Sequence, residues 1–461
     1  MKFKAAFIAL ITVYIFSLFC LPLAAEVTAA EITPSLYETQ VFDLIIKART
    51  KHLETAESTD SPSLLYNGNV YLAASDRSLD IFEDGLQVNG VWGSLAVADQ
   101  LRERGYIPSK TGEAVASLVF SNYISPGDAA KTLFNKILAD ELKLQIEEDR
   151  NILNPDFEDV GVSLRSGKVK LGGRWYNSYL LVLDFATSVM SCREMELMEL
   201  VNQAREIPMS VAVSLGMDSD KIVEDLPVLE DILTNGLPPF SFNESLYAAA
   251  TAHGLDMLEN NYYSYVSLDG SAVDDRISRE GYLPVFSDEL LGCLTSAGYM
   301  EPADIARMLF EANFKAELKP ENEDRIILNP ELKDAGTSFT VRAVDNGDGL
   351  YTTQHLLVAD CAAREEQAGL FLTGLVFEDL DGDALFDPGE GLAGIQITIQ
   401  GDSGKIDCFT NSAGGFAVQR EPGTYSVNAY LPEGSSEQEV TIEEQNVRVR
   451  FVVEVEEEEE G

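Results

Sequence analysis

The chain has 461 residues, with 77 acidic against 33 basic side chains, and its formal charge is −44. This acidity argues against nucleic acid and anionic membrane surfaces as partners, because like charges repel. At roughly 150 residues per domain, the length predicts about three domains.

Residues 1–30 are expected to be a secretory signal peptide. A charged start precedes an apolar run over 5–23, and Ala25 and Ala30 offer small residues for cleavage. A retained membrane anchor is the alternative, but Pro22 near the end of the run favours cleavage. No later segment is apolar enough to span a bilayer, so we expect no stable transmembrane segment after cleavage. The protein is expected to be secreted or extracytoplasmic, at the cell surface or in the periplasm.

A repeated phrase divides the rest of the chain. Residues 148–155 read EDRNILNP and residues 323–330 read EDRIILNP. A helical pattern precedes each phrase and an alternating pattern follows it. We therefore expect a tandem duplication in which a helix ends at the proline of each copy and a strand follows.

The first unit is expected to span 31–190 and the second 191–366. Apolar residues three and four apart predict helices in both units, and a run rich in aromatic and β-branched residues predicts a strand. The expected helices of the first unit are 41–49, 70–82, 101–106 and 128–146, and its strand is 174–185; in the second unit helices are expected at 197–208 and 243–257.

Four cysteines follow the signal, namely Cys192, Cys293, Cys361 and Cys408. An even number in an exported chain permits disulfides, and the sequence leaves their pairing open. None has the Cys-x-x-Cys spacing of a metal site, so structural thiols, free or bridged, are the favoured interpretation.

Short phrases of the second unit carry a family resemblance. They are Asn202–Arg205, Gly236–Pro239, an Ala-rich helix ending in His253–Met257, Asn261–Ser264, Leu268–Gly270, Asp275–Arg276, Gly281–Tyr282 and Ile327–Pro330. In this order and spacing the unit resembles the bacterial branch of the CAP superfamily, the cysteine-rich secretory, antigen 5 and pathogenesis-related proteins, whose domains are also called SCP domains. The first unit resembles it more weakly. The resemblance implies an α/β fold, a three-layer α-β-α sandwich, for each unit.

The cleft of that family usually carries two histidines and acidic residues that can hold zinc. Here Tyr265 stands where one histidine belongs, while Glu148 and Glu323 stand where the other does. The family's glutamate remains as Glu113 and Glu289. A zinc site needs three or four ligands in fixed geometry, so the resemblance implies that zinc is not bound.

A non-enzymatic role, binding or scaffolding an extracellular ligand such as a lipid, glycan or protein, follows from the missing histidines. His253, on the Ala-rich helix, is expected to pack or cap rather than to bind a metal. One alternative is an extracellular hydrolase or peptidase in which Glu289 and Glu323, or their counterparts in the first unit, form an acid–base pair. Against it, an acidic run such as 323–324 is usually a solvated helix end.

The other alternative is a lipid or other apolar small molecule in the cleft. Tyr262, Tyr263 and Tyr265 would then line it, although tyrosines at this spacing more often pack within the protein.

The third domain is expected to span 367–455 and to be an all-β sandwich. Short alternating segments with Gly-rich turns predict its strands at 370–377, 395–400, 415–419, 424–430 and 447–453. Residues 456–461 form an acidic tail.

A calcium loop is predicted between the first two of these strands. Carboxylates occupy the EF-hand ligand positions, and Leu385 can offer its carbonyl, so the predicted ligands are Asp379, Asp381, Asp383, Leu385, Asp387 and Glu390. Ala384 stands where an EF-hand has glycine, and Gly382 is expected to take the bend instead. A cation-free acidic turn is the alternative.

The loop also carries a second resemblance. With Gly391–Gly394, Thr410–Phe416 and Pro422–Val427, it resembles the calcium-binding B-type repeats of bacterial surface adhesins and related prealbumin-like sandwiches. In those proteins the module is a rigid spacer, so the resemblance implies Ca²⁺ as the cofactor of a stalk-like domain.

Overall fold

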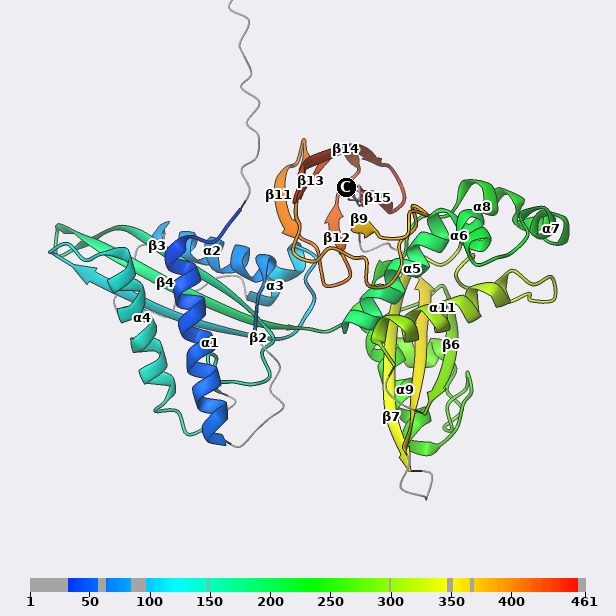
Figure 1. Ribbon diagram of the computed structural model, residues 1–461, viewed down its shortest axis with the longest axis horizontal. Helices are drawn as coiled ribbons and strands as arrows, with labels where there is room; N and C mark the ends of the chain where they lie inside the picture. The colour runs from blue at the N-terminus through cyan, green and yellow to red at the C-terminus, as the bar shows by residue number, and fades with distance from the viewer. Residues whose placement is uncertain are drawn as a thin grey trace, which may run out of the picture. The chain divides into compact units, whose positions relative to one another are not determined.

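The structure, a computed structural model, describes residues 32–56, 64–83, 97–146, 149–297, 300–345, 351–364 and 369–454. The expected signal peptide, Glu148 and the acidic tail lie outside the described residues. The described chain combines helices with mixed and antiparallel sheets, and its C-terminal part is rich in strands (Figure 1). Within these residues, no helix has both the length and the apolar character needed to cross a membrane.

The first sheet has the strand order β1-β3-β4-β2. Its elements are α1 (Leu36–Ala56), β1 (Leu65–Tyr66), α2 (Gly68–Glu83), α3 (Val97–Glu103), β2 (Pro108–Phe120), α4 (Pro126–Glu141), β3 (Asp159–Leu171) and β4 (Arg174–Ser188). Leu181 and Phe185 of β4 pack with α1 and α4, whereas Leu180 and Val182 pack with α2. Because successive side chains of a strand point to opposite faces, the apolar run of β4 reflects helices on both faces of the sheet.

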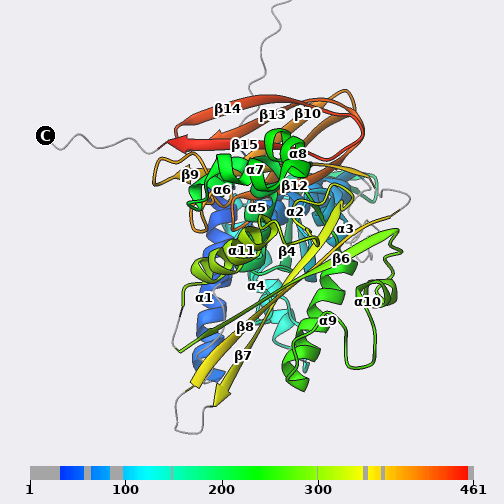
Figure 2. The same ribbon diagram turned by 90° about the vertical axis from the view of Figure 1, so that its right-hand side faces the viewer.

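The second sheet has the order β5-β7-β8-β6, which matches the first strand for strand. The elements before it are α5 (Cys192–Glu206), α6 (Pro208–Ser214), α7 (Ser219–Asp225), the 3₁₀ turn η2 (Pro227–Leu229) and α8 (Glu230–Asn235). Then follow β5 (Ser241–Phe242), α9 (Glu244–Asn260), α10 (Val273–Arg279), β6 (Phe286–Ser296), α11 (Pro302–Glu317), β7 (Asp334–Asp345) and β8 (Tyr351–Ala363). Leu357 packs with α5 and α11, and Val358 packs with α9, so α9 and α11 lie on opposite faces (Figure 2).

A glycine in the sheet allows one helix of each unit, α2 in the first and α9 in the second, to lie close to the sheet. A Cβ on Gly336 would lie 2.0 Å from the backbone nitrogen of Tyr247, and one on Gly161 would lie 2.2 Å from the carbonyl carbon of Val70. Real Cβ atoms do not approach other atoms this closely, so α9 and α2 can reach β7 and β3 only over glycine.

The repeated phrase is not a helix end, and the prediction of helices running to each proline was wrong. α4 ends at Glu141 and α11 at Glu317, and irregular chain follows each helix. The Glu317 carboxylate accepts hydrogen bonds from the backbone N–H groups of Ile326, Ile327 and Leu328 at 2.7–3.0 Å. These buried backbone N–H groups therefore have a side chain as their hydrogen-bond partner, so the segment can remain buried without being helical.

Two buried arginines complete this arrangement. Arg205 of α5 donates to the carbonyls of Ile327, Asn329 and Leu332. Arg49 of α1 donates in the same way to carbonyls of the first copy, those of Ile152, Asn154 and Phe157. The phrase is therefore a fixed irregular connection that is held by equivalent contacts in both halves.

The C-terminal region contains two sheets with the orders β11-β10-β13-β14 and β12-β9-β15. Its strands are β9 (Leu370–Asp379), β10 (Gln396–Gly401), β11 (Gly404–Phe409), β12 (Gly415–Arg420), β13 (Gly423–Leu431), β14 (Gly434–Ile442) and β15 (Val447–Glu454). Leu372 and Phe451 of one sheet share a core with Ile397 and Val427 of the other. The sequence did not predict β11 and β14. β14 is largely polar and exposed, and β11 is a short strand with one buried side chain, that of Cys408.

The four cysteines of the described chain are free thiols. Cys192 and Cys293 are exposed, whereas Cys361 and Cys408 are buried. The structure therefore joins none of the pairs that the sequence permitted.

Candidate functional site

The second half buries a polar cluster around Glu289 of β6. The Glu289 side chain is only 2% exposed, and its Oε1 accepts from Arg276 of α10 at 2.5 Å. The Nδ1 atom of His253 lies 2.7 Å from the same oxygen. Asn243 caps the start of α9 by accepting from Ser245 and Leu246, which starts the helix that carries His253.

Asp360 of β8 stands directly opposite Glu289 in the sheet and is fully buried. Burial, followed by the negative charge of Glu289, raises the pKa of Asp360 well above its ordinary value. Neither Asp360 carboxyl oxygen receives a hydrogen bond from a described residue, and neither does Glu289 Oε2. A proton on Asp360, shared with Glu289, would supply the donor that both groups need.

The first half has the same pair of carboxyl groups with a different partner. Glu113 of β2 stands opposite Asp184 of β4, and Arg77 of α2 donates to Glu113 at 2.8 Å. Burial, and then the charge of Glu113, raises the pKa of Asp184. Arg77 is thus a side-chain hydrogen-bond partner of Glu113, as His253 and Arg276 are of Glu289.

A polar cavity of about 370 Å³ adjoins the cluster of the second half. Its polar lining includes His253, Asp256, Asn260, Ser267, Arg276 and Arg279, from α9, α10 and the chain between them. The volume falls in the range of about 300–1,000 Å³ that small-molecule sites occupy.

The predicted cleft is assembled only in part. Tyr265 is 58% exposed, and burial and the charges of Glu289, Asp288 and Asp324 raise the pKa of its hydroxyl, which places it near these groups. Glu323 is exposed on irregular chain, and the Glu289 carboxylate is bonded to His253 and Arg276 rather than lying in a pair with Glu323. The sequence predicted that Glu323 is solvated, as it is, but also that it ends a helix, which it does not.

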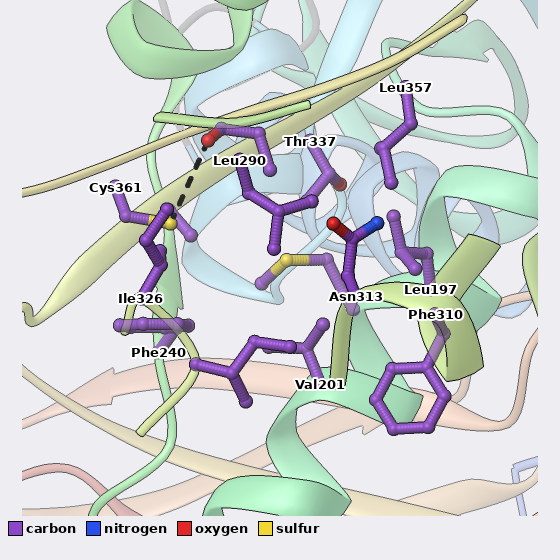
Figure 3. Close-up of a pocket in the computed structure, with 14 residues that line it drawn as sticks. Leu197, Val201, Phe240, Leu290, Phe310, Asn313, Ile326, Thr337, Leu357 and Cys361 are labelled. Carbon is purple, nitrogen blue, oxygen red and sulfur yellow. Dashed lines mark hydrogen bonds between the residues drawn. The ribbon is translucent and has the colours of Figure 1, made fainter. Parts of the chain in front are cut away.

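A second cavity lies in the core between α5, α11 and the sheet (Figure 3). Leu197, Val201 and Phe310 are among its lining residues, and its volume is about 20 Å³. A water needs about 10–15 Å³ measured in this way, so the space suits about one water and is far too small for an acyl chain. The lipid hypothesis therefore finds no room at this cavity.

The predicted calcium loop gathers three of its acids. Carboxylate oxygens of Asp379, Asp381 and Asp383 lie within 4.8 Å of one another. Asp379 accepts from the backbone N–H groups of Gly382 and Ala384, and these contacts shape the loop.

The other two acids lie outside that group. Asp387 lies 3.6 Å from the Arg307 guanidinium, and Glu390 accepts from the backbone N–H groups of Leu380 and Asp387. Burial, with neighbouring negative charges, raises the pKa of both Asp387 and Glu390. A hard cation bound by the carboxylates of the loop would reduce the repulsion between them.

The bend of this loop differs from expectation. Gly382 has φ +79°, as expected, but Ala384 also adopts a positive φ of +60°. A side chain is therefore held in the left-handed region at the position where an EF-hand has glycine.

The partners of Glu289 were not predicted from the sequence. His253 was expected to pack or cap, and Arg276 and Asp360 were given no role. One signal was present: His253 and Arg77 occupy equivalent places in the two helices that follow Asn243 and Asn67. A polar residue placed on the sheet-facing side of both helices indicates a buried partner.

No family model matches the sequence, and no curated protein matches it. Among solved structures, an outer surface protein of Borrelia burgdorferi is similar at 15% identity and a TM-score of 0.20, with 32% of this chain and 97% of that chain covered. An extracellular protein containing an SCP domain from Bacillus anthracis is similar at 12% identity and a TM-score of 0.20, with 43% and 60% covered. A DUF3823 family protein from Bacteroides ovatus is similar at 16% identity and a TM-score of 0.14, with 18% and 43% covered.

Proposed function

We propose that the chain is an exported, non-enzymatic binding or scaffold protein. In this proposal it consists of two tandem CAP-like α-β-α units followed by a calcium-stabilised, adhesin-like β-sandwich. The observation that carries it is the state of Glu289, which is 2% exposed and neutralised by Arg276.

A hydrolase that works through the cleft carboxylates would need one of them in contact with substrate. A general base must lie within hydrogen-bond reach of the proton it removes, and a carboxylate that is buried and already bonded to two side chains is poorly placed for this. Glu113 is also bonded to an arginine, Arg77, but its side chain is 27% exposed. The contacts of Glu289 support a structural role for that residue.

Calcium has a structural role in the proposal. Asp379, Asp381 and Asp383 would hold the ion, which would neutralise carboxylates that now face one another. Phe386, three residues after Asp383, is buried. Its backbone N–H donates to the side-chain oxygen of Gln203 in α5 at 2.7 Å, and its carbonyl accepts from the Gln203 amide nitrogen at 3.0 Å. Ordering of the loop would therefore also order its junction with α5.

The first test is a calorimetric titration with calcium and then zinc. We expect calcium binding that disappears in a variant carrying Asp381→Ala and Glu390→Ala and persists in the control Asp402→Ala, an exposed acid of the same region. Zinc binding that survives the loop variant would contradict the proposal, because it would require a metal site elsewhere.

The second test is an assay for hydrolysis of a peptide library. The proposal predicts no turnover by the wild-type chain. Turnover that is lost on Glu289→Gln or Glu113→Gln would establish the hydrolase instead.

A further inference from the structure

We propose that the outer edge of strand β6 binds an extended, basic peptide segment, which adds a strand to the second sheet and places a lysine or arginine side chain beside Tyr265 and Asp288. This proposal rests on the binding role proposed above and names the kind of partner. It arises from three features of this edge, namely its unpaired backbone, the acids around it and the exposed tyrosines beside it.

The edge of β6 is open over the length of a strand. β6 lies last in the order β5-β7-β8-β6, and among the described strands it pairs with β8 alone. In an edge strand, alternate residues turn their backbone N–H and C=O groups outward, where an extended peptide can bond to them. Such main-chain bonds give affinity for an extended segment, and side chains on either side of the edge select its sequence.

The first half of the chain shows how such an edge can be covered. There the side-chain amide of Asn151, in the repeated phrase, donates to the backbone carbonyl of Glu113 in β2 at 2.9 Å. Ile326 stands at the equivalent place of the second phrase, and Glu289 is the counterpart of Glu113. The side chain of Ile326 has no donor and is buried in the core. At this position the phrase therefore supplies a donor to the first edge and none to the second.

The charges near the start of β6 favour a basic partner. Burial raises the pKa of Asp288, and the negative charges of Asp324, Glu289 and Asp274 raise it further. The Asp288 carboxylate therefore lies among other acids. A cation brought to this place would lower the repulsion between them.

The arginines nearby are already engaged. Arg276 is bonded to Glu289. Arg325, which follows Asp324, donates to two backbone carbonyls at and just after the end of α11. The basic group that would compensate Asp288 must therefore come from a partner.

Tyr265 lies beside the edge rather than over one face of the sheet. Burial and the charges of Glu289, Asp288 and Asp324 raise the pKa of its hydroxyl, so it lies near these carboxylates. Glu289 and Asp288 are consecutive residues of one strand, and their side chains point to opposite faces. A ring that is near both carboxylates lies at the edge between the two faces, and the free edge of β6 is the one that β8 does not cover.

A second tyrosine extends this surface along the strand. Burial, with the groups of Tyr265, Cys293 and Glu289, raises the pKa of Tyr263 to about 12, which places Tyr263 near the same strand. Tyr263 is 55% exposed and Tyr265 is 58% exposed. A lysine or arginine attracted by Asp288 can therefore also lie over the face of an accessible aromatic ring.

Together these features favour one kind of partner. An acidic segment would be repelled by Asp288 and Asp324. A small free cation would pair with these acids but leave the backbone groups of β6 unused. An extended segment with basic residues uses the backbone, the acids and the rings at once. The exposed side chains of Val285 and Phe286, where β6 begins, favour apolar residues between the basic ones.

Fluorescence anisotropy with labelled peptides tests the proposal. The first probe has about seven residues, alternately lysine and valine, and blocked ends. The second is identical except for methyl groups on its backbone nitrogens, so it keeps the charge but cannot add as a strand. The third has glutamate in place of lysine. At about 0.15 M salt we expect saturable binding of the first probe, binding weaker by about tenfold or more for the second, and none for the third.

Matched variants locate the binding. Asp288→Asn keeps the acceptor for the backbone N–H of Glu289 but removes the charge, so it should weaken the affinity by about twofold to fivefold. The control Asp402→Asn, at an exposed acid of the C-terminal region, should leave the affinity unchanged. Tyr265→Ala should weaken it by about threefold, whereas Tyr123→Ala, at an exposed position of the first unit, should have no effect.

Each other result has a separate meaning for the two proposals. Equal affinity for the plain and methylated probes would overturn strand addition, because only non-specific attraction to an acidic surface would remain. Equal losses in a variant and its control would overturn the location. A dimer of this chain that the first probe does not dissociate would assign the edge to a second copy instead. Absence of binding would overturn this partner, while the non-enzymatic role stands on its own assays. A probe that is bound and then cleaved would overturn the non-enzymatic role and leave the surface in place.

Discussion

The guanidinium of Arg205 lies over the ring of Phe240, with its central carbon 3.8 Å from the centre of the ring. Arg205 is 1% exposed, and burial lowers its pKa to about 10. It also donates hydrogen bonds to two carbonyls of the repeated phrase, those of Ile327 and Asn329. One buried side chain therefore fixes an irregular segment that has no secondary structure of its own.

Replacement of Arg205 should destabilise the protein strongly. Arg205→Met keeps much of the packing against Phe240 but leaves buried carbonyls without donors, so we expect a loss of about 3–5 kcal/mol in the free energy of unfolding. Urea denaturation measures this loss. The control Arg174→Met, at an exposed position of β4, should cost less than about 0.5 kcal/mol. Similar losses in the two variants would contradict the role of Arg205.

The buried carboxyl groups should make the protein more stable in mild acid. Because the pKa of Asp360 is raised in the fold above its ordinary 3.8, the folded state holds a proton more tightly than the unfolded chain. The free energy of unfolding should then rise as pH falls from the folded pKa toward about 4, by up to about 1.4 kcal/mol per pH unit for each such group. Above the folded pKa, the cost of the buried charge is fully present.

Asp360→Asn tests this linkage. The amide can donate to Glu289 without carrying a charge, so the variant should be more stable than the wild type at pH 8 and should have a shallower pH dependence. Urea midpoints at pH 5 and pH 8 give both quantities, with Asp402→Asn as the exposed control. An unchanged slope would show that Asp360 does not hold the proton. Asp184→Asn should have the same effect through Glu113.

Ala384 should be a site of easy stabilisation. Its φ of +60° costs an alanine about 1 kcal/mol relative to glycine, so Ala384→Gly should raise the free energy of unfolding by up to that amount. The same change at Ala417, within strand β12, should instead lower it by about 0.5–1 kcal/mol. Thermal unfolding compares the two, and destabilisation at 384 would mean that the bend is not left-handed.

The thiols should divide into two classes. In the chain without residues 1–30, a water-soluble disulfide reagent should label Cys192 and Cys293 in the folded protein, and all four cysteines only after unfolding. Burial raises the pKa of both exposed thiols and raises that of Cys408 to about 12, so labelling should be slow at neutral pH. Four unreactive thiols in the unfolded, unreduced chain would reveal disulfides.

The sequence predicted much of the framework because local patterns determine it. The helix after Asn243 has apolar residues at helical spacing, and residues 174–185 are rich in aromatic and β-branched side chains; both elements are present, as α9 and β4. β11 and β14 were missed because a strand with few buried side chains has little apolar alternation to detect. The repeated phrase was misassigned because distant side chains, those of Glu317 and Arg205, satisfy its backbone.

The candidate site was predictable only in part for a related reason. Resemblance named Glu113 and Glu289 but gave no indication of what surrounds them. The contact between His253 and Glu289 joins residues 36 apart and depends on α9 packing over the sheet. Asp360 meets Glu289 only through the register of β6 and β8.

The position of β6 at the end of its sheet has a consequence for the protein in concentrated solution. Among the described strands β6 pairs with β8 alone, so its outer edge presents backbone groups that another chain could extend. Each copy carries a formal charge of −44, and mutual repulsion keeps such edges apart. The acidity, from which we expected no nucleic-acid partner, thus also opposes association between copies, and high salt or acid would remove this effect.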